Sequence, residues 1–147
     1  MGNYKHILLA VDFFEQAQSV IDRAIALANI NQASLSLIHI VEMIHLADSE
    51  YGFDGIMDAD ISNEMIAAAK IKLTRIGKEL GVEQDRIWIE MGSPKLEINR
   101  IAEENQVDLI VVGSHGRHGL QLLLGSTANG VLRHAKCDVL AVSLNDH

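Results

Sequence analysis

Two short stretches of the sequence have the residue types and the spacing to bind a phosphorylated ligand. Gly113 and Gly116 are three residues apart, and glycines at this spacing can leave backbone N–H groups pointing at one centre. Gly125, Ser126 and Thr127 then open a predicted helix, whose first N–H groups and positive dipole end attract an anion. Together they predict a phosphate site between a loop and a helix N-terminus.

Arg117 follows Gly116 in the same loop, between His115 and His118. It is a candidate phosphate contact, and a solvated loop side chain is the competing interpretation. The glycine spacing alone fits a tight strand-to-helix turn equally well. The pattern is not a Walker loop, because no Gly-Lys-Ser/Thr follows, and it is not the dinucleotide fingerprint, which belongs after the first strand.

A second candidate region is the end of the first predicted strand, where Val11 is followed by Asp12. A carboxylate at the carboxyl end of a central strand is a natural acceptor for ribose hydroxyls. Capping of the first helix is an alternative role of similar weight for Asp12.

Apolar runs typical of buried strands alternate with helical patterns along the chain. Residues 42–60 have no clear period and form a long connection, either a functional lid or an excursion. The patterns predict strands over 6–11, 34–41, 86–90, 108–112 and 138–142, and helices over 16–29, 63–80, 94–102 and 125–134.

The order βαβαβαβαβ predicts an α/β protein with one domain over residues 1–147. We expect a five-stranded, mostly parallel, doubly wound sheet of order 3-2-1-4-5, with helices on both faces. Ligands of such sheets bind beyond the carboxyl ends of the strands, where the strand order reverses. One candidate region follows the first predicted strand and the other follows the fourth, so both are expected at that point.

The composition excludes several other functions. The formal net charge of −8 disfavours nucleic acid and anionic membrane surfaces. No apolar run is long enough to cross a bilayer and no signal peptide is visible, so we expect a cytoplasmic protein. The seven histidines show no metal-ligand spacing. The sequence does not assign the role of catalytic base to a particular residue, so we expect binding without rapid turnover.

The whole chain resembles the universal stress protein family. In that family the fourth strand is followed by Gly-x-x-Gly and, after a loop, by Gly-Ser/Thr. Gly113, Gly116, Gly125 and Ser126 occupy those places. The resemblance also includes KHILLAVD at 5–12, LIHI at 37–40, GSP at 92–94, DLIVVGSHG at 108–116 and CDVLAV at 137–142.

The resemblance implies that the protein binds an adenine nucleotide, ATP or AMP, with or without Mg²⁺. Asp12 would contact the adenine or ribose beside Val11, and the Ile40 backbone would line the adenine pocket. The remaining contacts implied are Val112, Gly113 and Gly116 around ribose and phosphate, and Gly125, Ser126 and Thr127 on the phosphates.

The resemblance also implies a homodimer formed through the last strand, Asp138 to Ser143, and a role as a nucleotide sensor in the stress response. The chain departs from the family in two places. Eight residues separate Gly116 from Gly125, one fewer than usual, and Phe13 and Phe14 follow Asp12 where many members have small polar residues.

Three alternatives compete with a nucleotide sensor. One is a slow ATPase or an adenylate-transferring enzyme, and another is a dimeric stress protein that binds no nucleotide. The third is a receiver-like domain phosphorylated on Asp12. It lacks the second acceptor aspartate and the lysine that such domains need, because their places read Met91-Gly92 and SLN at 143–145.

Overall fold

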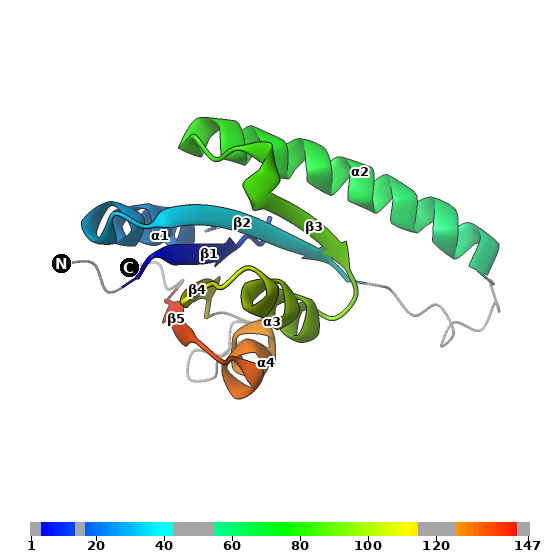
Figure 1. The fold of residues 1–147 in the computed structure, drawn as a ribbon. Helices are drawn as coiled ribbons and strands as arrows, with labels where there is room; N and C mark the ends of the chain where they lie inside the picture. The colour runs from blue at the N-terminus through cyan, green and yellow to red at the C-terminus, as the bar shows by residue number, and fades with distance from the viewer. Residues whose placement is uncertain (1–3, 14–16, 43–54, 115–125, 144–147) are drawn as a thin grey trace.

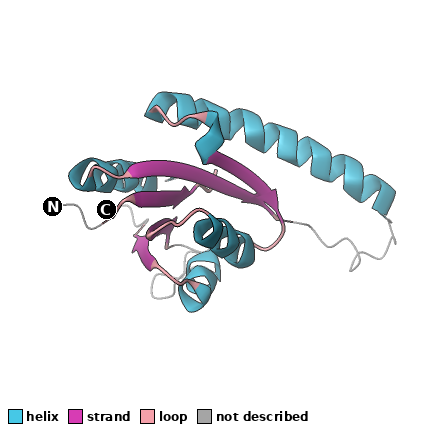
Figure 2. Cartoon of the chain, in the orientation of Figure 1, coloured by secondary structure: helices cyan, strands magenta, loops and turns pink. Residues whose placement is uncertain are grey.

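The computed structural model describes residues 4–13, 17–42, 55–114 and 126–143, and only the backbone at residues 17, 55–60, 62 and 126. Strands and helices alternate through this part of the chain (Figures 1 and 2). The strands are β1 (His6–Ala10), β2 (Ser34–Val41), β3 (Ile87–Met91), β4 (Leu109–Gly113) and β5 (Asp138–Val142). The helices are α1 (Ala17–Asn31), α2 (Gly55–Leu80), α3 (Pro94–Glu104) and α4 (Ser126–His134), with a short 3₁₀ turn at Gln84–Arg86.

The five strands form one sheet of order β3-β2-β1-β4-β5, in which every pairing is parallel. The predicted fold and strand order are therefore confirmed. Leu9 of β1 pairs with Leu37 of β2 and with Val111 of β4, which fixes the register on both sides of the central strand.

Helices lie on both sides of the sheet (Figure 1). Each face of the sheet carries its own hydrophobic layer. On one face α1 and α2 cover a cluster that includes Ile7, Leu9 and Leu37. On the other face α3 and α4 cover a cluster that includes Leu8 and Ile38. Consecutive residues of a strand point to opposite faces, so the unbroken apolar runs in β1, β2 and β4 supply both layers.

The helix boundaries follow recognisable signals with one exception. Gly81 has a φ of 72° directly after α2, as expected of a C′ glycine. Ser93 is the N-cap of α3 with Pro94 at its first position, although the Ser93 side chain makes no capping hydrogen bond. The exception is α2, which begins at Gly55, because residues 55–60 are helical despite their lack of an amphipathic period.

Polar contacts fasten the amino-terminal edge of the sheet. The backbone N–H groups of Lys5 and His6 donate to the Asp108 carboxylate at 2.8 and 3.0 Å. The His6 ring bonds to the Asn105 carbonyl through Nδ1 and to the fully buried Ser36 hydroxyl through Nε2. These contacts join the starts of β1, β2 and β4.

We expect Asp108→Ala to destabilise the protein, because the Lys5 and His6 amides lose their acceptor. The loss of free energy of unfolding should be about 1–3 kcal/mol. The matched control is Asp85→Ala, because Asp85 is exposed and has no hydrogen bond or ion pair with the part of the chain that is described. Urea titration followed by circular dichroism measures both variants. Equal stability of the two would contradict this role of Asp108.

Candidate functional site

The candidate site lies at the carboxyl edge of the sheet, between β1 and β4. The chain runs from β1 to β2 and β3 on one side, and then crosses to β4 and β5 on the other. Strand order reverses at this point, where open parallel sheets bind their ligands. The β1–β4 pairing runs as far as Leu9 and Val111, and Val11 and Gly113 each lie two residues further along their chain segments, toward this edge.

The predicted contacts on the strands divide between the two faces. Ile40 and Val112 are buried in the layer under α3 and α4, on the strands that flank β1. Val11 is buried in the opposite layer, under α1 and α2. Asp12 is the next residue and is exposed. The structure thus brings Val11, Asp12, Ile40 and Val112 to one edge, with Ile40 and Val112 facing the same layer as α4.

The backbone that leads into the predicted phosphate loop is fixed at its start. Gly113 keeps strand geometry and pairs with Val142. Ser114 N–H then donates to the Val142 carbonyl at 2.8 Å. The positive φ that glycine makes possible is therefore not used at Gly113. The predicted contacts Gly116, Arg117 and Gly125 lie outside the described residues.

Helix α4 begins at Ser126, so Ser126 and Thr127 form its first turn as predicted. The helix packs into the hydrophobic layer through Ala128 and Val131, which are fully buried. Gly130 packs so closely on α3 that a Cβ at this position would lie 2.7 Å from the Lys95 Cβ. The N-terminus of α4 lies at the carboxyl edge, and the first N–H groups of a helix, which have no partner within the helix, suit a phosphate together with the positive dipole end.

Three residues that the sequence did not mark as site residues surround the turn after β1. The His39 Nδ1 lies 2.7 Å from the Val11 carbonyl oxygen, and the His39 and Phe13 rings stack with centroids 4.2 Å apart. Lys72 of α2 places its Nζ 5.4 Å from the Phe13 ring centroid. The sequence offered one sign of these contacts, because His39 is a histidine inside an apolar strand. We expect such a histidine to have a hydrogen-bond partner within the core.

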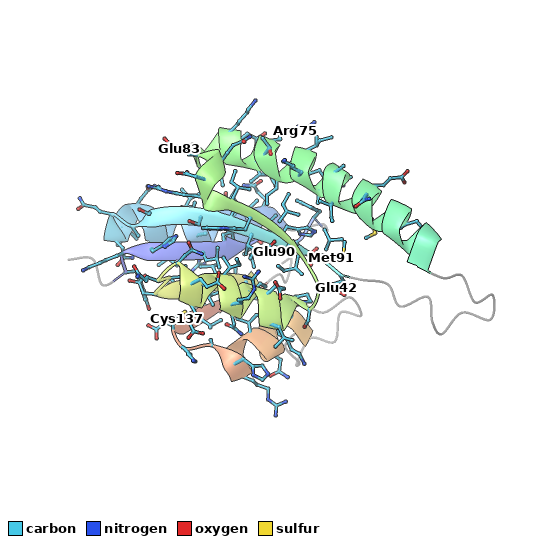
Figure 3. The ribbon with its side chains drawn as sticks, turned by 45° about the vertical axis from the view of Figure 1, so that its right-hand side comes forward. Glu42, Arg75, Glu83, Glu90, Met91 and Cys137 are labelled. Atoms are coloured by element: carbon cyan, nitrogen blue, oxygen red, sulfur yellow. The ribbon has the colours of Figure 1, made fainter. Side chains whose placement is uncertain are left out.

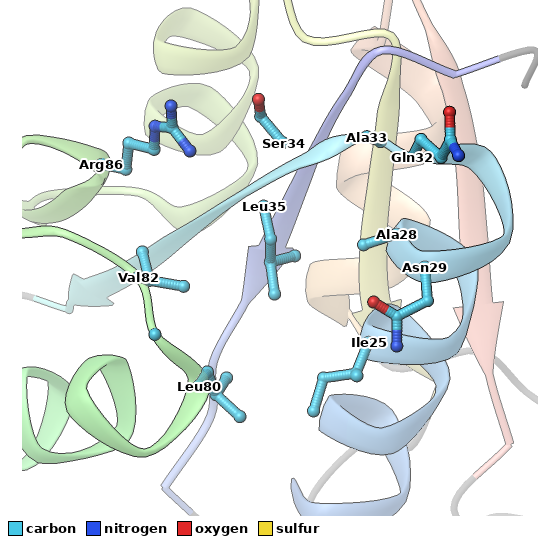
Figure 4. Close-up of a pocket in the computed structure, with 11 residues that line it drawn as sticks. Ile25, Ala28, Asn29, Gln32, Ala33, Ser34, Leu35, Leu80, Val82 and Arg86 are labelled. Carbon is cyan, nitrogen blue, oxygen red and sulfur yellow. The ribbon is translucent and has the colours of Figure 1, made fainter.

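The opposite edge of the sheet has other features that do not join this site. A hollow of about 300 Å³ lies there between the ends of α1 and α2, with Ile25, Leu35 and Leu80 among its apolar walls and Arg86 at its side (Figure 4).

Cys137 lies near the same edge, away from Glu42 and Met91 at the carboxyl edge (Figure 3). Burial, aided by the charges of Asp138 and Asp108, raises the pKa of the Cys137 thiol, which disfavours the reactive thiolate.

The described residues offer neither a metal site nor a membrane-spanning helix. No group of three or more histidine, cysteine, aspartate or glutamate side chains among them could hold a metal ion. None of the helices within the described ranges is both long and apolar enough to cross a membrane.

Comparison with known proteins identifies the same family that the sequence motifs resemble, over nearly the whole chain. Residues 3–143 match the model of the universal stress protein family. The chain is 40% identical over 145 residues to Universal stress protein A homolog 2 of Coxiella burnetii, covering 98% of each chain.

Solved structures agree with the fold. The hypothetical protein MJ0577, solved as a test case for structure-based assignment of function, superposes with a TM-score of 0.80 at 30% identity, covering 98% of this chain and 99% of that one. A universal stress protein in complex with cAMP superposes with a TM-score of 0.58 at 22% identity, covering 97% and 98%, and shares the fold. On the family match and the sequence identity, this chain belongs to the universal stress protein family.

Proposed function

We propose that this protein is a stress-response regulator that binds an adenine nucleotide, ATP or AMP, and acts as a homodimer. The observation that supports the proposal is that Asp12, Ile40 and Val112 lie at the carboxyl ends of β1, β2 and β4, where strand order reverses, and that Ile40 and Val112 share a hydrophobic layer with α4. This arrangement offers an apolar wall for a base, a carboxylate for ribose hydroxyls and backbone N–H groups for phosphates.

The arrangement also explains how an acidic protein can hold an anion. With a net charge of −8, the overall field repels a nucleotide, so binding requires local donors. The α4 N-terminus supplies such donors without a charged side chain. The structure solved with cAMP is of a protein with the same fold, and it supports an adenine nucleotide as the ligand class.

We propose binding without rapid turnover. Phosphoryl transfer needs a group that positions the attacking nucleophile and a cation or arginine that stabilises the transferred charge. The sequence assigns neither role to a particular residue. A phosphate-release assay with ATP and Mg²⁺ measures turnover directly, and steady hydrolysis that fails in Gly116→Val would make the protein an ATPase.

The homodimer is proposed to form through β5, which is one of the two outermost strands of the sheet. The other edge strand, β3, carries Glu90, whose carboxylate accepts from Arg100 at 2.7 Å. Arg100 also pairs with Glu97 and Glu104 on α3, so a group of charged side chains lies beside Glu90 of this edge strand. Charged side chains discourage pairing of an edge strand. In β5, Val139–Ala141 are apolar and half-buried, which leaves this edge suited to pairing with a second copy.

For nucleotide binding, we expect ATP or AMP to raise the melting temperature of nucleotide-free protein. A ligand present at ~100 times its Kd adds roughly 2.7 kcal/mol, and each kcal/mol raises the Tm of a chain this size by roughly 2–4 °C. GTP, with and without Mg²⁺ like the adenine nucleotides, tests the choice of base.

The rise should shrink in Asp12→Asn and Gly116→Val and persist in Asp22→Asn, an exposed carboxylate on α1. Unchanged melting with every nucleotide, or an equal rise in all three variants, would contradict the proposed site.

For the dimer, we expect the unmodified protein to sediment at twice the mass of the chain. Ala141→Lys places a charge in β5 and should give monomers, because two copies of the charge would meet across the interface. Ile89→Lys, a half-buried residue of β3, is the matched control and should remain dimeric. Circular dichroism checks that both variants fold. Monomeric Ile89→Lys together with dimeric Ala141→Lys would assign the interface to β3 instead.

A further inference from the structure

Val11 and Phe13, which follow β1, both contact the side chain of His39 on β2. His39 is half-buried on the face covered by α1 and α2, the face opposite to Ile40. Its Nδ1 lies 2.7 Å from the Val11 carbonyl oxygen. A carbonyl oxygen only accepts hydrogen bonds, so the Nδ1 carries the hydrogen and donates it.

Both backbone groups of Val11 are thereby tied to β2. Its N–H donates to the Ile38 carbonyl at 2.8 Å, and its carbonyl accepts from the His39 ring. The regular β1 strand has already ended at Ala10. The attachment of β1 to β2 thus extends beyond the strand, up to the residue before Asp12.

The residue after Asp12 is held by ring contacts. The Phe13 ring stacks on the His39 imidazole with 4.2 Å between centroids and 32° between planes. On α2, the Lys72 Nζ lies 5.4 Å from the Phe13 ring centroid, within the range of a cation–π contact. Phe13 also packs against the core cluster under α1 and α2. Asp12 therefore stands between two residues that the same histidine contacts.

We propose that His39 is a positioning residue of the ligand site: by holding Val11 and Phe13 it fixes the backbone that presents Asp12 to the nucleotide. This inference rests on the proposed function. A backbone that is ordered before binding loses less conformational entropy when the ligand arrives. Release of one residue from this restraint should weaken nucleotide binding roughly tenfold.

Two substitutions separate the contacts of His39. His39→Phe keeps a ring to stack on Phe13 and removes the donor to Val11. His39→Asn keeps a side-chain N–H donor and removes the ring. The matched control is His6→Phe, because His6 is also a half-buried histidine with hydrogen-bonded ring nitrogens but lies at the amino-terminal edge.

The experiment measures the Kd for ATP by calorimetry and the Tm of each full-length variant. We expect His39→Phe to raise the Kd about tenfold, with a smaller rise in His39→Asn. His6→Phe should lower the Tm and leave the Kd unchanged. An unchanged Kd in both His39 variants, or a rise in His6→Phe equal to that in His39→Phe, would overturn the proposal.

A second measurement separates this inference from the proposed function. If the unmodified protein binds no adenine nucleotide, the proposed function fails, and amide hydrogen exchange of ligand-free protein decides the role of His39. Faster exchange at residues 11–13 in His39→Phe, absent in His6→Phe, would support positioning of the turn. Equal protection of these amides in both variants would overturn it. Should His39→Phe not fold, His39→Asn tests the ring contact instead, and unchanged exchange at Phe13 in His39→Asn would overturn the proposal.

Discussion

Every strand pairing in the sheet is parallel, and this constraint decides where the rest of the molecule can act. Parallel strands need crossover helices, so each strand begins at one edge and ends at the other. The loops after β1 and β4 consequently lie at the same edge, although about a hundred residues separate them in the chain. Reversal of strand order beside β1 sends these loops to opposite faces and opens the site between them.

The amino-terminal and carboxyl edges of the sheet differ in the polar contacts that they make. At the amino-terminal edge, the Asp108 carboxylate accepts from the Lys5 and His6 backbone N–H groups, and the His6 ring bonds to the Ser36 hydroxyl, so these contacts join three strands. At the carboxyl edge, Asp12 is exposed, and the first N–H groups of α4 have no partner within their own helix. Stability is thus concentrated away from the proposed ligand site, and His39 is the histidine that extends strand attachment toward it.

The fold could be predicted because its signals are local. Apolar runs such as the one at 6–11 indicate buried strands, and Gly81, Ser93 and Pro94 mark helix ends by backbone chemistry. The position of Val11, Asp12, Ile40 and Val112 at the carboxyl edge could also be predicted, because order along the chain defines it, whereas their contact with a ligand stays a prediction. The start of α2 was missed, because residues 55–60 have no amphipathic period. The contacts among His39, Phe13 and Lys72 were also missed, because three separate elements supply them and only tertiary packing brings them together.

The most direct test of a nucleotide site at the carboxyl edge is an amide NMR titration of the full chain with ATP. We predict that the largest chemical-shift changes fall on the amides of residues 12, 40, 113 and 127, while the amide signals of His6, Asp108 and Arg86 at the other edge do not move. Largest shifts around Arg86 and Leu35, which line the hollow at the amino-terminal edge, would contradict it. So would a titration in which no carboxyl-edge amide moves.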